Sequence, residues 1–84
     1  MVKRETRVTD GATLRKSRLM GMFNFIANNE GATTMMVQSY MLMNHGLKFK
    51  TTSEYLYEAE LAGSIKLSQS GEWVISKDFK KYLR

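Results

Sequence analysis

Hydrophobic side chains in the first half of the chain recur at a helical period. Leu19, Phe23 and Ile26 lie three or four residues apart, so they share one face of a helix. This pattern predicts a helix from Leu14 to about Asn28 whose apolar face packs on a core. The first turn of this helix also contains a basic cluster, made of Arg15, Lys16 and Arg18.

A second helix is predicted after a short polar turn. Thr33 or Thr34 can cap its N-terminus, because a threonine hydroxyl accepts a hydrogen bond from an amide of the first turn, and the pattern ends near His45. The stripe expected to face the core consists of Met36, Tyr40, Met43 and Leu47, widened by Val37 and Met41. Methionines usually fill gaps in a core, although such a stripe can also form an adaptable surface for a partner.

A third helix is predicted to begin at Thr51 and to end before Gly63. Thr51 and Glu54 have the spacing of a capping box, in which each side chain accepts a bond from the backbone amide of the other residue. Leu47 and Phe49, in the preceding turn, are expected to anchor the chain by pointing inward. Gly63 is expected to end the helix, because glycine tolerates the backbone that follows many helices.

Two short strands joined by a tight turn are predicted after this helix. Residues 64–68 alternate apolar and polar side chains in the manner of a strand, and residues 72–76 do the same. Residues 69–71 between them have the composition of a hairpin turn. Trp73 is expected to lie against the third helix and the base of the hairpin. The predicted fold class is therefore mainly α with a small β-hairpin.

The chain is expected to form one folded unit with a basic segment at each end. Residues 1–12 are expected to be a flexible basic arm, residues 13–76 the folded domain, and residues 77–84 a short basic C-terminal helix. A chain of 84 residues with 43% hydrophobic content can form one small core. It has no cysteine and no apolar run near the roughly 18 residues of a membrane span, so we expect a cytoplasmic protein without a membrane segment.

The sequence offers no motif for catalysis or for cofactor binding. Glycine-rich nucleotide loops, nucleophile elbows and the zinc motif His-Glu-x-x-His are missing, and His45 is the only histidine. Glu54, Glu58 and Glu60 could form a carboxylate cluster, but a solvated helix face accounts for them more simply, and a metal would want more ligands. We therefore expect no enzyme activity and no metal, cofactor or small-molecule site.

The net charge of the chain is +5, and the position of the charges is more informative than their sum. Residues 1–18 carry six basic and two acidic side chains, and residues 77–84 carry four basic and one acidic. Residues 19–76 carry three basic and five acidic side chains, so the positive charge gathers at the two ends. Basic ends of this kind either bind phosphates or are solvated tails.

The segment from Gly46 to Ile65, followed by Gly71 and Trp73-Val74-Ile75, resembles the recognition helix and wing of winged helix-turn-helix proteins. It is similar in particular to the small proteins of this family from archaea and from archaeal plasmids and viruses. The resemblance extends over about residues 14–76 and implies a winged helix-turn-helix of three helices and a two-stranded wing. The short C-terminal helix that follows is expected from residues 77–84 themselves. In that family the third helix enters the major groove of DNA, and the tip of the wing touches the flanking backbone.

The resemblance also implies which residues would contact DNA. On the side of the third helix they are Lys48, Lys50, Thr51, Thr52, Ser53 and Tyr57, and on the wing they are Gln69, Ser70 and Gly71. The N-terminal arm adds Lys3, Arg4 and Arg7, which suit phosphates or a minor groove. The chain departs from the family pattern in one respect. Its third helix carries glutamates and no arginine or lysine from Thr51 to Ala62, so that helix cannot recognise guanine through arginine.

These observations favour a sequence-specific double-stranded DNA-binding protein that regulates transcription as a homodimer. A dimer is expected because one short helix contacts few base pairs. Phe79, Tyr82 and Leu83, with part of the first helix, either form its interface or cover the edge of the core. Two alternative functions stay open. One is a winged helix that binds RNA or repeated sequences, and the other is a protein-interaction module that uses the acidic third helix.

Overall fold

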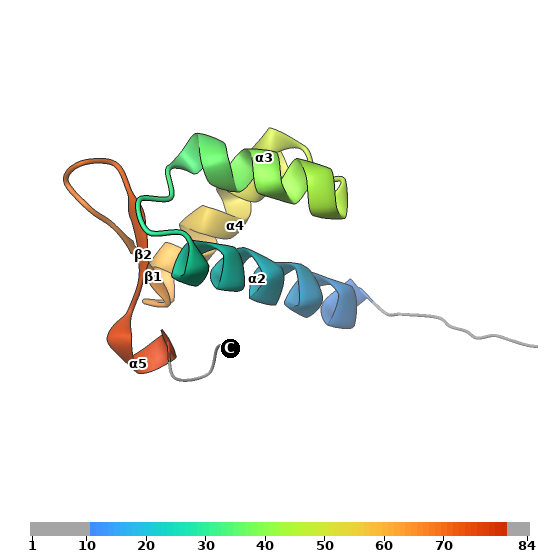
Figure 1. Cartoon of the computed structure of the whole chain (residues 1–84). Helices are drawn as coiled ribbons and strands as arrows, with labels where there is room; N and C mark the ends of the chain where they lie inside the picture. Colours follow the sequence, from blue (N-terminus) through green and yellow to red (C-terminus); the bar gives the residue numbers. More distant parts are fainter. Residues whose placement is uncertain (1–10, 81–84) are drawn as a thin grey trace, which may run out of the picture.

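The computed structural model of the protein describes residues 11–80, and it is mainly helical with one two-stranded antiparallel sheet (Figure 1). The elements in chain order are α2 (Gly11–Asn28), α3 (Thr34–His45), α4 (Phe49–Leu61), β1 (Ile65–Leu67), β2 (Trp73–Ile75) and α5 (Lys77–Lys80). The predicted fold class, mainly α with a small β-hairpin, is confirmed at this level. Residues 11 and 12, which we expected in the arm, belong to α2, while residues 1–10 and 81–84 lie outside the described part.

The ends of α3 follow from residues at its two termini. Thr33 is the N-cap, as predicted, and its side-chain oxygen accepts a hydrogen bond of 3.2 Å from the amide of Met36. At the other end Gly46 adopts a left-handed backbone with φ of 66°, and its amide donates to the carbonyl of Leu42. This conformation turns the chain at once, so that Leu47 enters the core one residue later.

The start of α4 differs from the prediction by two residues. Its N-cap is Lys48, which makes no side-chain capping bond, and the amide of Thr52 donates to the carbonyl of Lys48 at 3.1 Å. Thr51 therefore lies inside the first turn, and the predicted capping box is wrong. Phe49 is 46% exposed rather than inward, because Leu47 alone anchors this turn and the helix then carries the ring outward.

One core joins α2, α3, α4 and the hairpin. Its buried hydrophobic residues are Met22, Phe23, Ile26, Ala32, Val37, Met41, Leu47, Tyr55, Leu56, Ala59, Ile65 and Trp73. From α3 the inward side chains are Val37 and Met41, so the prediction that Met36 and Met43 face the core is wrong. This helix is apolar on most sides, and a shift of one residue turns the helix face by about 100°. Packing, rather than the pattern, selects the inner face.

The hairpin continues directly from α4 and closes one end of the helices (Figure 1). Gly63 has φ of 84°, and the amide of Ser64 donates to the carbonyl of Ala59, which together end α4 and begin the strand. The strands pair with Ile65 opposite Ile75 and Leu67 opposite Trp73. The short helix α5 follows β2.

Trp73 fastens the hairpin to the helices. Its backbone amide donates to the carbonyl of Ala32 at 2.7 Å, and its indole N–H donates to the hydroxyl of Thr34 at 2.9 Å. Next to it, Thr33 and Glu72 form an isolated antiparallel bridge. The turn between α2 and α3 therefore lies alongside the start of β2, and the hairpin is held at a fixed position on the helical body.

The C-terminal segment packs on the edge of the core. The ring of Phe79, in α5, meets the ring of Phe23 edge to face, with centroids 4.8 Å apart. For Phe79 this favours the role of a cover over the core edge, while Tyr82 and Leu83 lie outside the described residues. No helix within residues 11–80 is long and apolar enough to cross a membrane.

Candidate nucleic-acid interface

One exposed stripe runs along α4 from its first turn. It consists of Lys50, Ser53, Glu54, Tyr57 and Glu58, which line a shallow hollow of about 570 Å³. These positions are separated by three or four residues, so they share one face of the helix. The stripe is therefore a continuous polar surface with a lysine at its N-terminal end and one aromatic ring toward its C-terminal end.

The structure divides the predicted contact residues of this helix into two sets. Lys48, Lys50 and Tyr57 are exposed and available to a ligand. Thr52 has an exposed fraction of 0%, so its prediction as a DNA contact is wrong. Thr51 and Ser53 are half-buried. Because the helix starts at Phe49, Thr52 is already helical and lies one turn before Tyr55 and Leu56, so it points into the core with them.

Ser53 is held in place by a neighbouring helix. Its hydroxyl oxygen accepts a hydrogen bond of 2.9 Å from the side-chain amide of Gln38, which belongs to α3. The hydroxyl proton of Ser53 can still be donated to a ligand, since a serine hydroxyl is both donor and acceptor. Gln38 was not among the predicted site residues, and a separation of 15 residues gave no signal for this pair.

The hairpin adjoins the stripe rather than standing apart from it. Ser53 and Tyr57 also line a smaller hollow of about 200 Å³ whose other side is formed by Leu67 and Trp73. The α4 stripe therefore continues onto Leu67 and Trp73, the strand pair of the hairpin that lies next to its turn. A rigid ligand that contacts Tyr57 would meet β1 next.

The predicted hairpin residues form an exposed and internally bonded turn. Gln69, Ser70 and Gly71 are all exposed at its tip. The amide of Gly71 donates to the carbonyl of Ser68, and the hydroxyl groups of Ser68 and Ser70 lie 3.0 Å apart. These bonds fix the shape of the turn without using the side chain of Gln69.

Lys66 is an exposed cation on this hairpin that the sequence analysis did not select. It pairs with Val74 in the strand register, and both side chains are exposed. The alternation of the strand contained the signal, because Ile65 is buried and its neighbour must then face the other side. Lys66 adds a positive charge to the outer face of the hairpin.

Arg15, in the second turn of α2, connects the basic cluster of this helix to α4. Its guanidinium forms an ion pair with Glu58 and lies 5.1 Å from the centre of the Tyr55 ring. These residues are far apart in sequence, and no local pattern indicated the contact. The pair offsets the charge of Glu58 at one end of the α4 stripe, whereas Glu54 has no ion-pair partner within residues 11–80.

The remaining predicted contacts, Lys3, Arg4 and Arg7, lie outside the described residues. Within residues 11–80 no three histidine or acidic side chains lie close enough together to hold a metal ion. No protein-family model, no curated protein and no solved structure matches this chain. A proposal of function for this chain must therefore rest on the geometry of the α4 stripe and the hairpin.

Proposed function

We propose that this protein is a winged helix-turn-helix protein that binds double-stranded DNA in a sequence-specific manner and regulates transcription as a homodimer. In this assignment α3 and α4 form the helix-turn-helix, α4 enters the major groove, and the β1–β2 hairpin is the wing. The observation that carries the proposal is the continuity of the α4 stripe, through Ser53 and Tyr57, with the end of the hairpin strands next to the turn. A duplex seated on α4 would meet the hairpin without a gap.

The residues of this surface suit different parts of a duplex. Lys48 and Lys50 lie at the N-terminus of α4, where their charge adds to the positive end of the helix dipole and favours phosphate. Ser53 and Tyr57 can donate to base edges, and Glu54 can accept from the amino group of cytosine. The corrected start of α4 supports this role for Glu54, because no capping bond occupies its carboxylate.

Most of the affinity would come from phosphate neutralisation. The basic ends of the chain, including Lys3, Arg4 and Arg7 in the arm, supply more positive charge than α4 itself. Each neutralised phosphate releases bound counterions, so binding of this kind weakens steeply as salt rises. If a dimer neutralises about six to eight phosphates, its affinity should fall by roughly 1,000-fold or more between about 50 and 200 mM salt.

The test is a titration of labelled duplex with Lys48→Ala/Lys50→Ala, followed by fluorescence anisotropy at several salt concentrations. Lys77→Ala/Lys80→Ala is the comparison variant, because it removes the same charge from exposed positions of α5. Loss of the α4 pair should weaken binding by roughly tenfold or more, reduce the salt slope by about two per protomer and alter preference among duplexes. The α5 pair should leave that preference unchanged.

An equal effect of the two variants on preference among duplexes, or no effect of the α4 pair on binding, would exclude α4 from the interface. The alternative function of a protein-interaction module would then be favoured, because Glu54, Glu58 and Glu60 are all exposed on α4 and suit a basic protein partner. Salt-dependent binding to a structured RNA but not to duplex would instead favour the RNA-binding alternative. Sequences selected from a random duplex pool, in the presence of that RNA as competitor, distinguish the two nucleic acids.

A further inference from the structure

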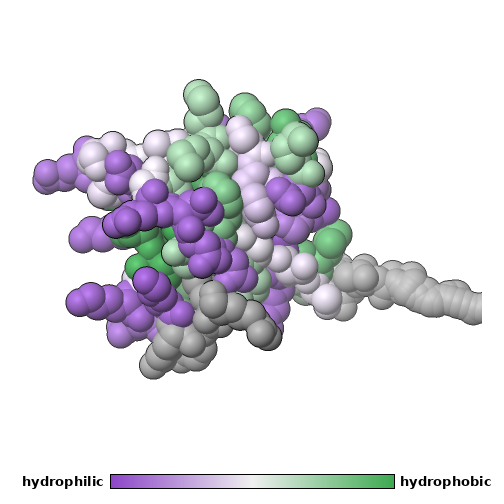
Figure 2. Space-filling view, in the orientation of Figure 1, coloured by the Kyte–Doolittle hydropathy of each residue, from purple (hydrophilic) through white to green (hydrophobic). Residues whose placement is uncertain are grey.

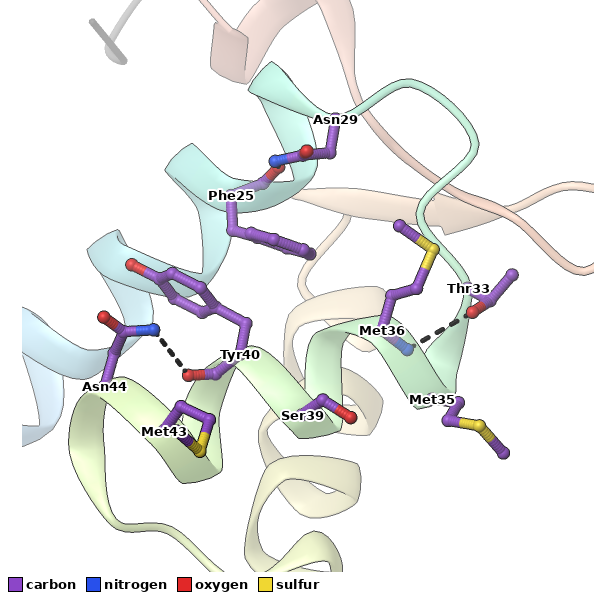
Figure 3. Close-up of a pocket in the computed structure, with 9 residues that line it drawn as sticks. All are labelled: Phe25, Asn29, Thr33, Met35, Met36, Ser39, Tyr40, Met43 and Asn44. Atoms are coloured by element: carbon purple, nitrogen blue, oxygen red, sulfur yellow. Dashed lines mark hydrogen bonds between the residues drawn. The ribbon is translucent and has the colours of Figure 1, made fainter.

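A second surface, formed by α2 and α3, has no role in the proposed DNA contact. We call it the methionine face and define it by Phe25, Met35, Met36, Ser39, Tyr40 and Met43, which line a groove of about 620 Å³ (Figure 3). The rings of Phe25 and Tyr40 stack with centroids 4.5 Å apart and form its floor. The described residues that line this groove come only from α2, α3 and the turn between them, so the α4 stripe stays free.

The methionines of this face are unusually accessible for apolar side chains. Met35 is 71% exposed and Met43 is 81% exposed, and Figure 2 shows hydrophobic side chains along the edge of the molecule where α3 lies. Large apolar patches on a protein surface mark interaction sites. Methionine suits such a surface, because its flexible and polarizable side chain adapts to a facing surface.

The methionine face is also almost without charge. Residues 19–47, which contain all of it, include only Glu30 and His45 among the aspartate, glutamate, lysine, arginine and histidine residues of the chain. Every lysine and arginine of the chain lies outside this segment. Two copies of a protein with net charge +5 repel each other, and this is the surface on which they can meet without bringing like charges together.

We propose that a second copy of this chain docks on the methionine face, so that the dimer forms through α2 and α3 and not through the C-terminal segment. The proposal rests on the proposed function in one respect, namely that a DNA-binding dimer must leave both α4 helices free. The polar side chains around the groove, Ser39, Asn29 and Asn44, each carry a donor and an acceptor, so they can bond to polar side chains of the same surface on a second copy across a two-fold axis.

The first experiment measures the oligomeric state of the full chain without DNA. Sedimentation equilibrium from micromolar to millimolar concentration should show a monomer–dimer equilibrium for the unmodified protein. Met43→Lys should raise the dissociation constant by roughly 100-fold or more, because like charges brought together across an interface are strongly unfavourable. Leu61→Lys is the matched control and should have no effect, since Leu61 is also apolar, 70% exposed and in the last turn of its helix.

A second measurement separates a lost interface from a damaged fold. Met43→Lys and Met43→Glu should each be monomeric, and a mixture of the two should recover a heterodimer, because opposite charges then face each other. The absence of cysteine allows a direct proximity test. Ser39→Cys should form a disulfide-linked dimer under mild oxidation, whereas Ser70→Cys, on the hairpin turn, should not.

A chain that stays monomeric at millimolar concentration overturns the proposal and leaves the methionine face to a different protein. A dimer that persists in Met43→Lys, or that crosslinks through Ser70→Cys and not through Ser39→Cys, overturns it as well. Failure of the two proposals can be told apart. A monomer that binds duplex contradicts only the dimer, and a dimer that dissociates in Met43→Lys but binds no duplex contradicts only the DNA-binding function.

Discussion

Thr52 lies in the core, fully buried, with a side-chain oxygen that has no hydrogen-bond partner within residues 11–80. A buried hydroxyl without a partner costs about 1–3 kcal/mol, because it loses its bonds to water. Thr52→Val replaces the oxygen by a methyl group of similar shape. We expect the free energy of unfolding, measured by urea denaturation, to rise by about 1 kcal/mol.

Thr52→Ser is the control for this substitution. It keeps the hydroxyl and removes the buried methyl group, so it should lower the free energy of unfolding by about 1 kcal/mol. A valine variant that is less stable than the unmodified protein would mean that the hydroxyl does form a bond in solution. The assignment of Thr52 to the core would still be tested by the serine variant.

Gly21 is a second residue with a close contact, because it lies where α2 meets the side chain of His45 in α3. A Cβ atom at this position would lie 2.8 Å from Nε2 of His45, so the absence of a side chain lets α3 approach α2 closely. Glycine in a helix normally costs about 1 kcal/mol relative to alanine. Replacing Gly21 by alanine would normally raise the free energy of unfolding by that amount. We expect Gly21→Ala to leave it unchanged or to lower it, because the imidazole of His45 must move.

A double-mutant cycle isolates this contact. In the His45→Ala background the same Gly21→Ala substitution should stabilise the protein by about 1 kcal/mol, since nothing then opposes the added methyl group. Thermal melting or urea denaturation of the four proteins provides the comparison. Equal effects of Gly21→Ala in both backgrounds would contradict a close contact between Gly21 and His45.

At the scale of the elements, sequence patterns correctly predicted those helix ends and strands that depend on residues close together in the chain. The threonine cap of α3, the glycine after α4 and the two strands of the hairpin each depend on residues close in sequence, and the structure has them where the pattern indicated. In β1 the expected alternation of burial ends after Ile65, because Leu67 is 42% exposed. The predicted start of α4 was wrong because the carbonyl of Lys48 accepts a helical hydrogen bond from the amide of Thr52, although the side chain of Lys48 is a poor cap. The helix therefore begins with this backbone bond and not with the capping bond predicted for the Thr51 hydroxyl.

Contacts between elements could not be predicted in the same way. The outward position of the α3 methionines depends on which face meets α2 and α4, and an apolar helix offers more than one such face. The ion pair of Arg15 with Glu58 and the bond of Trp73 to Thr34 join residues about half a chain length apart. Of the residues at the candidate site, the sequence analysis selected the exposed Lys48, Lys50 and Tyr57. It did not select Arg15, Gln38 or Lys66.

The attachment of the hairpin to the helices depends on Trp73. Trp73→Ala removes a buried ring and its bond to Thr34, so the free energy of unfolding should fall by about 3–5 kcal/mol. Trp73→Phe keeps most of the apolar contact and loses the indole donor, and it should cost less than the alanine variant. An alanine variant with an unchanged melting temperature and lost DNA binding would instead make Trp73 a direct contact.

At the scale of the whole molecule, charge is separated along the chain. Residues 19–47 are nearly uncharged, while the two ends carry most of the positive charge, so DNA and a second copy would use different surfaces. Such an arrangement draws a polyanion toward the basic ends before any specific contact forms. The two proposals therefore do not compete for the same residues.

Deletion of residues 1–9 tests the share of the basic arm in this attraction. The segment contains Lys3, Arg4 and Arg7 and few apolar residues, so the melting temperature should stay unchanged. Affinity for specific and scrambled duplexes should fall together, and the salt slope should decrease by about two to three per protomer. Unchanged affinity would make these residues a solvated tail.

The single tryptophan of the chain has a consequence for spectroscopy. Trp73 lies where the hairpin, α3 and the α4 stripe meet, with Tyr57 lining the same small hollow. Its emission is therefore a built-in optical reporter of that junction, because water that enters there would shift the fluorescence to longer wavelength. Detachment of the hairpin and unfolding of the helices can then be followed separately, by indole fluorescence and by far-ultraviolet circular dichroism, without any added label.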